Sequence, residues 1–175
     1  MRRSEEDRIT RLEDVEEIRR LTIRYANAAD RRNDPRVMRE LFSEDAVWES
    51  KGFGVFKGRA QILAGLREIA ATRVSHTLHY MIAPLVDVAS DRRSARASWR
   101  LWELAHLRDE TGSKFHPVMG GGDYTCRLVQ MDGKWRFQHL LLKISTVVRY
   151  PVDSVIGTRA KSPRKADKVS PAKRA

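Results

Sequence analysis

The sequence predicts an α+β domain in which about three N-terminal helices pack on one face of a cone-shaped, curved antiparallel sheet. Up to residue 72, apolar residues recur every three or four positions, which is typical of helices. After residue 73 the chain changes to long segments rich in Val, Thr, Tyr and Ile, which favour strands. Helices at one end of a chain and strands at the other indicate the α+β class, with the helices covering the sheet. We expect a pocket at the mouth of this cone.

Length and cysteine content narrow the class of protein. A chain of 175 residues fits one domain, since domains typically contain about 100–150 residues. Its single cysteine, Cys126, has no partner for an internal disulfide, which excludes a disulfide scaffold and a zinc site made of several cysteines. No apolar segment approaches the roughly 20 residues that span a bilayer, and no apolar stretch follows the charged N-terminus. We therefore expect a soluble, cytoplasmic protein without membrane contact.

Much of the positive charge lies near the C-terminus. The formal net charge is +11, and residues 159–175 carry +6 of it. Residues 160–173 contain one Val and no other large apolar residue, so apolar burial cannot offset the entropy cost of ordering them. We expect a flexible N-terminus at residues 1–8, a domain at 9–150 and an extended, largely disordered basic tail at 151–175. A solvated tail is the simpler interpretation, and weak nucleic-acid contact through the tail is the alternative.

Capping signals place the three helices. Thr10 and Glu13 form a capping-box pattern that predicts the start of the first helix. One apolar face follows, at Leu12, Val15, Ile18, Leu21 and Tyr25. This helix ends near Asp30, and the pair Asp34-Pro35 is typical of a second helix start. Apolar spacing predicts a third helix over about residues 59–72.

The strands are expected mainly in the second half of the chain. A short strand candidate lies at residues 45–49, followed by a turn-rich stretch punctuated by glycines. Asp132-Gly133 is a strong signal for a two-residue hairpin turn. The four long strands are predicted at residues 74–88, 94–106, 123–131 and 134–149.

Strand alternation leaves the orientation of Glu103 open. The odd positions of residues 94–106 are apolar except Glu103, so a regular strand would point this carboxylate inward. An inward carboxylate needs a partner, because burying an unpaired charge is costly. The apolar residues Trp102 and Leu104 on the other face equally favour a bulge that leaves Glu103 exposed.

The histidines are candidates for acid–base chemistry and not for metal binding. His76 and His79 have opposite parity in one strand, and the pattern alone does not choose which of them faces the pocket. His139 follows Trp135 and Phe137 at alternate positions and is expected in the interior. Because the five histidines match no local metal-ligand spacing, we expect no metal site. Nucleotide-binding glycine motifs are also missing from the sequence.

Five segments have a recognisable order and spacing. They are Tyr25–Asp30, Leu41–Trp48, Gly54–Gly58, His76–Tyr80 and Asp132–Phe137. Together they resemble the SnoaL-like group of the nuclear transport factor 2-like superfamily, which consists of small cone-shaped α+β domains, and the resemblance covers about residues 9–150. Within this superfamily the sequence looks most like cofactor-free dehydratases and dehydrochlorinases, such as scytalone dehydratase and bile-acid 7α-dehydratase.

The resemblance implies a set of catalytic residues. Those lyases use a His–Asp pair, often with a tyrosine from the first helix, and these roles fall on His79, Asp30 and Tyr25. The resemblance thereby favours His79 over His76. A further acidic residue of some members falls near Glu103.

One departure from the family concerns the dehydrochlorinase. Its basic residue on the third strand has no clear counterpart here, where Gln130 and Met131 stand. This difference argues against that particular reaction.

We therefore expect a cofactor-independent, dehydratase-like lyase or isomerase that acts on a small apolar or polycyclic substrate. Side chains that could line the pocket are Trp48, Phe53, Phe56, Trp99, Glu103 and His139. The alternative is a module of the same fold that binds a small ligand or dimerises without catalysis, since fold does not determine function. We expect a homo-oligomer, a dimer or a trimer, under either interpretation.

Overall fold

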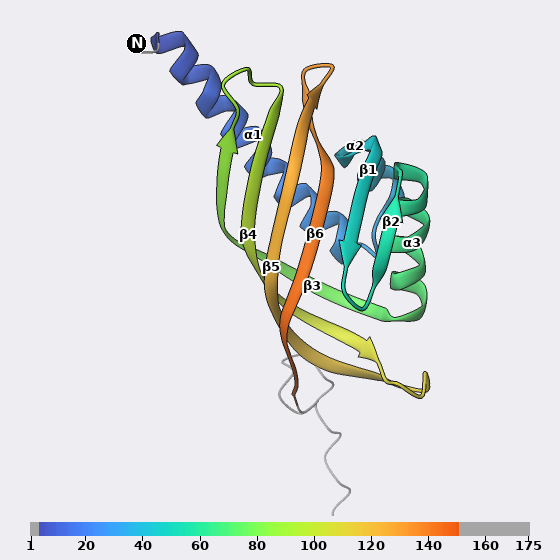
Figure 1. Ribbon diagram of the computed structural model, residues 1–175. Coiled ribbons are helices and arrows are strands. Elements are labelled where there is room, and N and C mark those ends of the chain that lie inside the picture. Colours follow the sequence, from blue (N-terminus) through green and yellow to red (C-terminus); the bar gives the residue numbers. More distant parts are fainter. Residues whose placement is uncertain (1–3, 151–175) are drawn as a thin grey trace, which may run out of the picture.

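Three helices pack on one side of a curved six-stranded sheet in the computed structural model, which describes residues 4–150 (Figure 1). The elements are α1 (Glu5–Asp30), α2 (Pro35–Leu41), β1 (Phe42–Ser50), β2 (Gly54–Lys57), α3 (Arg59–Thr72), β3 (Val74–Val88), β4 (Ser94–Arg108), β5 (Phe115–Met131) and β6 (Lys134–Arg149). The predicted α+β class is confirmed. The sheet bends around the helices and does not close into a barrel.

The strand order in the sheet is β2-β1-β6-β5-β4-β3. Strands β3 to β6 form an antiparallel meander, as the hairpin signals predict. The sheet is nevertheless mixed, because β1 runs parallel to β6. These two strands are joined through most of the chain and not by a hairpin, so no turn constrains them to be antiparallel. The short strand β2, which pairs with β1, lies in the glycine-punctuated stretch for which the sequence predicts many turns.

Helix α1 begins earlier than the capping box predicts. Ser4 is the N-cap, and its Oγ accepts a hydrogen bond from the Asp7 backbone N–H at 3.1 Å. The Thr10 hydroxyl instead donates to the carbonyl oxygen of Glu6 at 2.8 Å, so the predicted start at Thr10 is wrong. Residues 5–8, expected to be a flexible N-terminus, are part of this helix. Leu12 is 68% exposed because the buried face of this part of α1 runs through Asp14 and Ile18.

Irregular positions in two strands change which side chains face the helices. In β3 the pairing with β4 shifts between Ile82 and Leu85, where Ala83 has a φ of 50°. In β6 the pairing with β5 shifts opposite Arg127 and Leu128, so that Gln138 is an extra residue. An extra residue moves every later side chain to the opposite face of the sheet.

The core lies between α1 and the concave face of the sheet. Its centre is an aromatic cluster in which Tyr25 makes edge-to-face contacts with Phe42, Tyr124 and Phe137, at centroid distances of 5.8–6.2 Å. All four side chains are buried. This cluster fixes the last turns of α1 against β5 and β6, and it therefore fixes the direction in which the end of α1 points.

Two further predictions concern the chain ends and membranes. The basic tail predicted at residues 151–175 lies outside the described residues. Within residues 4–150, no helix has both the length and the apolar character needed to cross a membrane.

Candidate active site

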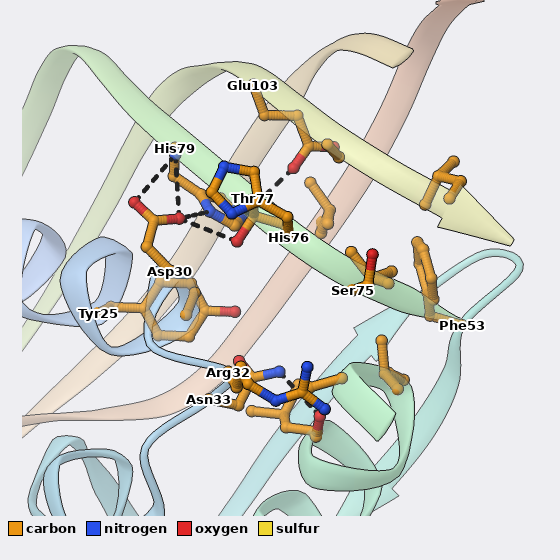
Figure 2. Close-up of a pocket in the computed structure, with 18 of the residues that line it drawn as sticks. Tyr25, Asp30, Arg32, Asn33, Phe53, Ser75, His76, Thr77, His79 and Glu103 are labelled. Carbon is orange, nitrogen blue, oxygen red and sulfur yellow. Dashed lines mark hydrogen bonds and ion pairs between the residues drawn. The ribbon is translucent and has the colours of Figure 1, made fainter. Parts of the chain in front are cut away.

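A cavity of about 680 Å³, including its open mouth, lies between the end of α1, α3 and the concave face of the sheet (Figure 2). Apolar side chains form much of its wall, among them Trp48, Phe53, Leu66, Ile69 and Leu142. Three ionisable side chains, Asp30, His79 and Glu103, meet inside it. An apolar pocket with a few convergent polar groups is the usual form of a small-molecule site.

Asp30 and His79 form a close pair at the wall of this cavity. The Nδ1 atom of His79 lies 2.7 Å from Oδ1 of Asp30. The carboxylate also accepts hydrogen bonds from the backbone N–H of His79, at 3.1 Å and 3.2 Å, and from the Thr77 hydroxyl, at 2.9 Å. Burial alone would raise the pKa of Asp30, but the hydrogen bonds and charge interaction with His79, together with Thr77, hold it below its usual value. Asp30 is therefore ionised at neutral pH.

The local structure explains why these groups meet. Asp30 is the last residue of α1, and α1 packs across β3. Thr77 and His79 are two positions apart in β3, so both side chains point to the helix-covered face. His76 has the opposite parity and is exposed, although it contributes to the mouth of the cavity.

Glu103 approaches His79 from the neighbouring strand. His79 and Glu103 are directly paired in the β3–β4 ladder, which places both side chains on the same face. The Nε2 atom of His79 lies 3.4 Å from Oε2 of Glu103 (Figure 2). Of the two alternatives for this carboxyl group, the structure therefore shows the inward one.

The surroundings of Glu103 favour its neutral form. Burial raises its pKa above the usual value, His79 acts in the opposite direction and the charge of Asp30 raises it further. On β5 the paired residue is Gly120, where a Cβ would lie only 2.8 Å from Oε1 of Glu103. The missing side chain at Gly120 makes room for the carboxyl group.

Tyr25 is a buried phenol at the inner end of the cavity. Its hydroxyl oxygen accepts a hydrogen bond from the Trp48 indole N–H at 3.0 Å. Burial raises the pKa of Tyr25 to about 12, against the effect of its hydrogen bonds to Trp48 and Tyr124. The phenol is therefore protonated at pH 7, and it retains its own O–H as a donor.

Three of the predicted pocket residues lie elsewhere. Phe56 stacks on Trp48 at a centroid distance of 5.5 Å and does not line the cavity. Trp99 also faces inward from β4, but it lies four residues before Glu103, in a part of the core that side chains fill. Its indole N–H points at the Met81 sulfur, 2.9 Å away. His139 lies on the outer face, 3.2 Å from Oε1 of Glu49, because the extra residue at Gln138 reverses the alternation of β6.

Several residues of the cavity were not predicted. Thr77 contacts Asp30, and Tyr124 contacts Tyr25. Thr77 could have been found from the sequence, because it has the same strand parity as His79. Arg32 and Asn33, just after α1, line the mouth. Within residues 4–150, no group of three or more His, Cys, Asp or Glu side chains could hold a metal ion.

Comparison with known proteins agrees with this architecture. The family model described as SnoaL-like domain matches residues 10–140. The chain belongs to the SnoaL-like family. This result confirms the family resemblance noted in the sequence. No curated protein matches this SnoaL-like chain significantly.

Solved structures give the same fold for this SnoaL-like protein. A type 3 hexachlorocyclohexane dehydrochlorinase from Novosphingobium barchaimii LL02 matches 91% of this chain and 100% of its own, with a TM-score of 0.69 and 19% identity. A type 2 hexachlorocyclohexane dehydrochlorinase matches 93% and 100%, with a TM-score of 0.70 and 18% identity. A scytalone dehydratase-like protein from Novosphingobium aromaticivorans DSM 12444 matches 82% and 91%, with a TM-score of 0.68 and 24% identity. At these identities the likeness concerns the fold alone.

Proposed function

We propose that this SnoaL-like protein is a cofactor-independent lyase or isomerase of the dehydratase type, acting on a small apolar or polycyclic substrate. The observation that carries the proposal is the position of His79 between an ionised Asp30 and a largely buried Glu103 inside a mostly apolar cavity. The dehydrochlorinase and dehydratase-like structures of the same fold agree with this class of reaction. Elimination of water needs a base and an acid, and His79 and Glu103 in a largely apolar cavity would supply them.

In this proposal His79 is the general base. Asp30 accepts the Nδ1 proton, which fixes the tautomer and leaves the lone pair of Nε2 directed into the cavity. Nε2 would remove a proton from a substrate carbon next to a carbon that bears a hydroxyl group. The ionised Asp30 then stabilises the imidazolium that forms.

Glu103 is the matching general acid. In its protonated form, which burial favours by raising its pKa, the carboxyl group would donate a proton to the leaving hydroxyl, which departs as water while the C=C double bond forms. After this step His79 holds one extra proton and Glu103 lacks one. The distance of 3.4 Å between them allows the proton to return directly, which resets both groups. Without a leaving group, His79 could give the proton back at another carbon, which would be an isomerisation.

Tyr25 would orient the substrate. Since its hydroxyl oxygen accepts from Trp48, its own O–H can donate to a substrate carbonyl oxygen. A carbonyl group next to the reacting carbon makes its proton more acidic. A hydrogen bond from a neutral phenol to the carbonyl oxygen stabilises the enolate that develops. This arrangement favours cyclic β-hydroxy ketones as substrates.

Histidine substitution tests the proposal directly. A panel of cyclic β-hydroxy ketones is screened for the ultraviolet absorbance of the conjugated enone that loss of water produces. His79→Ala should abolish this activity, whereas His139→Ala, which changes a histidine on the outer face, should leave it intact. Circular dichroism checks that both variants fold. Turnover by His79→Ala at the wild-type rate would refute the proposed mechanism.

A second candidate function is a self-associating module, because the outer face of the sheet is apolar. Tyr80 and Trp102 are paired across β3 and β4 and both are exposed there. Other exposed apolar side chains of these strands are Leu78, Ile82 and Leu85. Exposed apolar patches mark contact sites. Sedimentation should show a dimer or trimer that Trp102→Lys dissociates, and a monomeric wild-type protein would contradict this candidate.

A further inference from the structure

Arg32 is a cationic side chain at the mouth of the cavity. It lines the cavity from the segment that follows α1 (Figure 2). In this view Glu103 lies at the top of the cavity and Arg32 at the bottom, with the Tyr25 hydroxyl between them. No carboxylate of residues 4–150 lies within ion-pair distance of the Arg32 guanidinium. Asp34, the acid that follows it in the sequence, is bound to Arg36.

The backbone holds Arg32 in a conformation that arginine rarely adopts. Arg32 and Asn33 have φ values of 59° and 56°, both in the left-handed region. Asn tolerates this region, and glycine is the usual residue there, but a residue with a long side chain is disfavoured. Three hydrogen bonds hold the turn. Two are backbone bonds, from Asn33 N–H to the Ala29 carbonyl at 3.2 Å and from Asp34 N–H to the Ala28 carbonyl at 3.0 Å, and in the third the Asn33 side-chain amide donates to the Leu66 carbonyl at 2.8 Å.

The turn therefore carries an arginine, whose side chain lines the cavity, at a position where glycine would adopt the backbone conformation more easily. Unfavourable backbone conformations persist where the surrounding structure enforces them, and they cluster at functional sites. Arg92, in the β3–β4 turn, has the same backbone conformation with a φ of 57°, but Arg32 is the arginine that combines this conformation with a place at the cavity mouth.

We propose that Arg32 binds an anionic group of the substrate, so that the proposed lyase acts on compounds that carry a carboxylate or phosphate. This inference rests on the proposed function for the chemistry at the other end of the cavity. The guanidinium binds either anion through two parallel hydrogen bonds. The ionised Asp30 repels an anion from the inner end, so the uncharged, reacting part of the substrate points toward His79. Arg32 thereby sets the direction in which the substrate enters.

Binding of two matched probes tests this inference without any turnover. The probes are 2-naphthoate and 2-naphthamide, which share a ring system and differ in charge, and isothermal titration calorimetry gives their Kd values. The wild-type protein should bind the carboxylate about five- to tenfold more tightly than the amide. Raising the salt concentration should reduce this preference, because the mouth is open to solvent.

The variants separate a specific role of Arg32 in anion binding from a general effect of positive charge. Arg32→Gln should remove the preference, and Arg32→Lys should keep part of it, since a lysine retains the charge but not the fork of donors. Arg31→Gln is the matched control: it removes the same charge one residue away, at a position that does not line the cavity. Equal affinity of the wild-type protein for both probes, no binding of 2-naphthoate, or an equal loss in Arg31→Gln would each overturn the proposal.

The outcome also distinguishes this inference from the proposed function. His79→Asn removes the proposed base and should retain the preference for 2-naphthoate. A carboxylate preference in a protein without lyase activity would leave Arg32 as an anion-binding residue and refute only the catalytic proposal. Turnover of neutral cyclic substrates without a carboxylate preference would refute only the role of Arg32.

Discussion

His79 contacts Asp30 both through its ring and through its own backbone. The ring Nδ1 lies 2.7 Å from Oδ1, and the backbone N–H of the same residue lies 3.1 Å and 3.2 Å from the two carboxylate oxygens. One carboxylate at the end of α1 thus fixes the position of the strand residue and the orientation of its imidazole. The second ring nitrogen is left facing Glu103 and the cavity.

Replacing Asp30 with asparagine should impair turnover far more than folding. In Asp30→Asn the amide no longer stabilises the imidazolium and can donate to Nδ1, which would select the wrong tautomer. We expect kcat to fall by about 10²- to 10⁴-fold, in line with the loss of such a carboxylate in other His–Asp pairs. Steady-state kinetics and thermal melting measure the two effects. Asp87→Asn, at a solvent-exposed aspartate, is the control, and similar kcat values for the two variants would contradict this role of Asp30.

Glu103 should make stability depend on pH in the opposite direction to Asp30. Its pKa is raised above 4.5, so its contribution to stability is complete below about pH 4.5 and is lost as pH rises through the higher folded-state pKa. Gln cannot ionise. The free energy of unfolding of Glu103→Gln should therefore improve, relative to the wild-type protein, as pH increases above 4.5. Urea unfolding from pH 4 to 8 measures this difference.

Asp30 provides the comparison for that experiment. Its pKa is held below 3.8, so its contribution is present above that pH and is lost as pH falls through the lower folded-state pKa. Asp30→Asn should consequently become less destabilising as the solution is acidified below pH 3.8. If the difference in unfolding free energy between Glu103→Gln and the wild-type protein did not change with pH, burial would not raise the pKa of the Glu103 carboxyl group.

Gly120 should be required for the position of Glu103. A Cβ at Gly120 would lie 2.8 Å from Glu103 Oε1, so Gly120→Ala must displace the carboxyl group. We expect about a tenfold loss of activity and a change in the ¹⁵N shifts of the His79 ring. Gly121→Ala is a matched control, because a Cβ there would meet nothing closer than 3.7 Å. Unchanged His79 shifts in Gly120→Ala would contradict the proposed contact.

The parts of the site that follow regular periodicity could be predicted from the sequence. The apolar stripe of the first helix predicts the buried positions of Ile18, Leu21 and Tyr25, because helical spacing determines which face is buried. Strand alternation gives the inward position of Glu103 only as one of two equal alternatives, because Trp102 and Leu104 on the other face favour a bulge. The choice of His79 over His76 needed the family resemblance, because parity cannot tell which face of a strand meets the helices.

Other features depend on tertiary structure that periodicity does not encode. The extra residue at Gln138 moves His139 to the outer face, and a single inserted residue leaves no clear trace in an alternating pattern. The left-handed conformation of Arg32 is invisible in the sequence, since glycine is the residue that normally signals it. The place of Trp99 in the filled core depends on how far along β4 the cavity extends.

Asp14 should be a determinant of stability far from the proposed chemistry. Its side chain is 4% exposed and lies 2.6 Å from Arg92 Nε, and it accepts a hydrogen bond from the Trp135 indole at 3.1 Å. Asp14→Ala leaves that indole N–H unsatisfied in the core and should cost about 1–3 kcal/mol of unfolding free energy. The value stays below that of a fully buried pair because Arg92 is 39% exposed.

Urea unfolding and the activity assay together test this role. Asp87→Ala removes an aspartate whose side chain is 86% exposed, and we expect it to cost less than about 0.5 kcal/mol. Since Asp14 does not line the cavity, kcat of Asp14→Ala should remain close to that of the wild-type protein under conditions where both are folded. A stability loss no larger than that of Asp87→Ala would mean that the contacts of Asp14 with β6 and the β3–β4 turn do not hold the first half of α1 on the sheet.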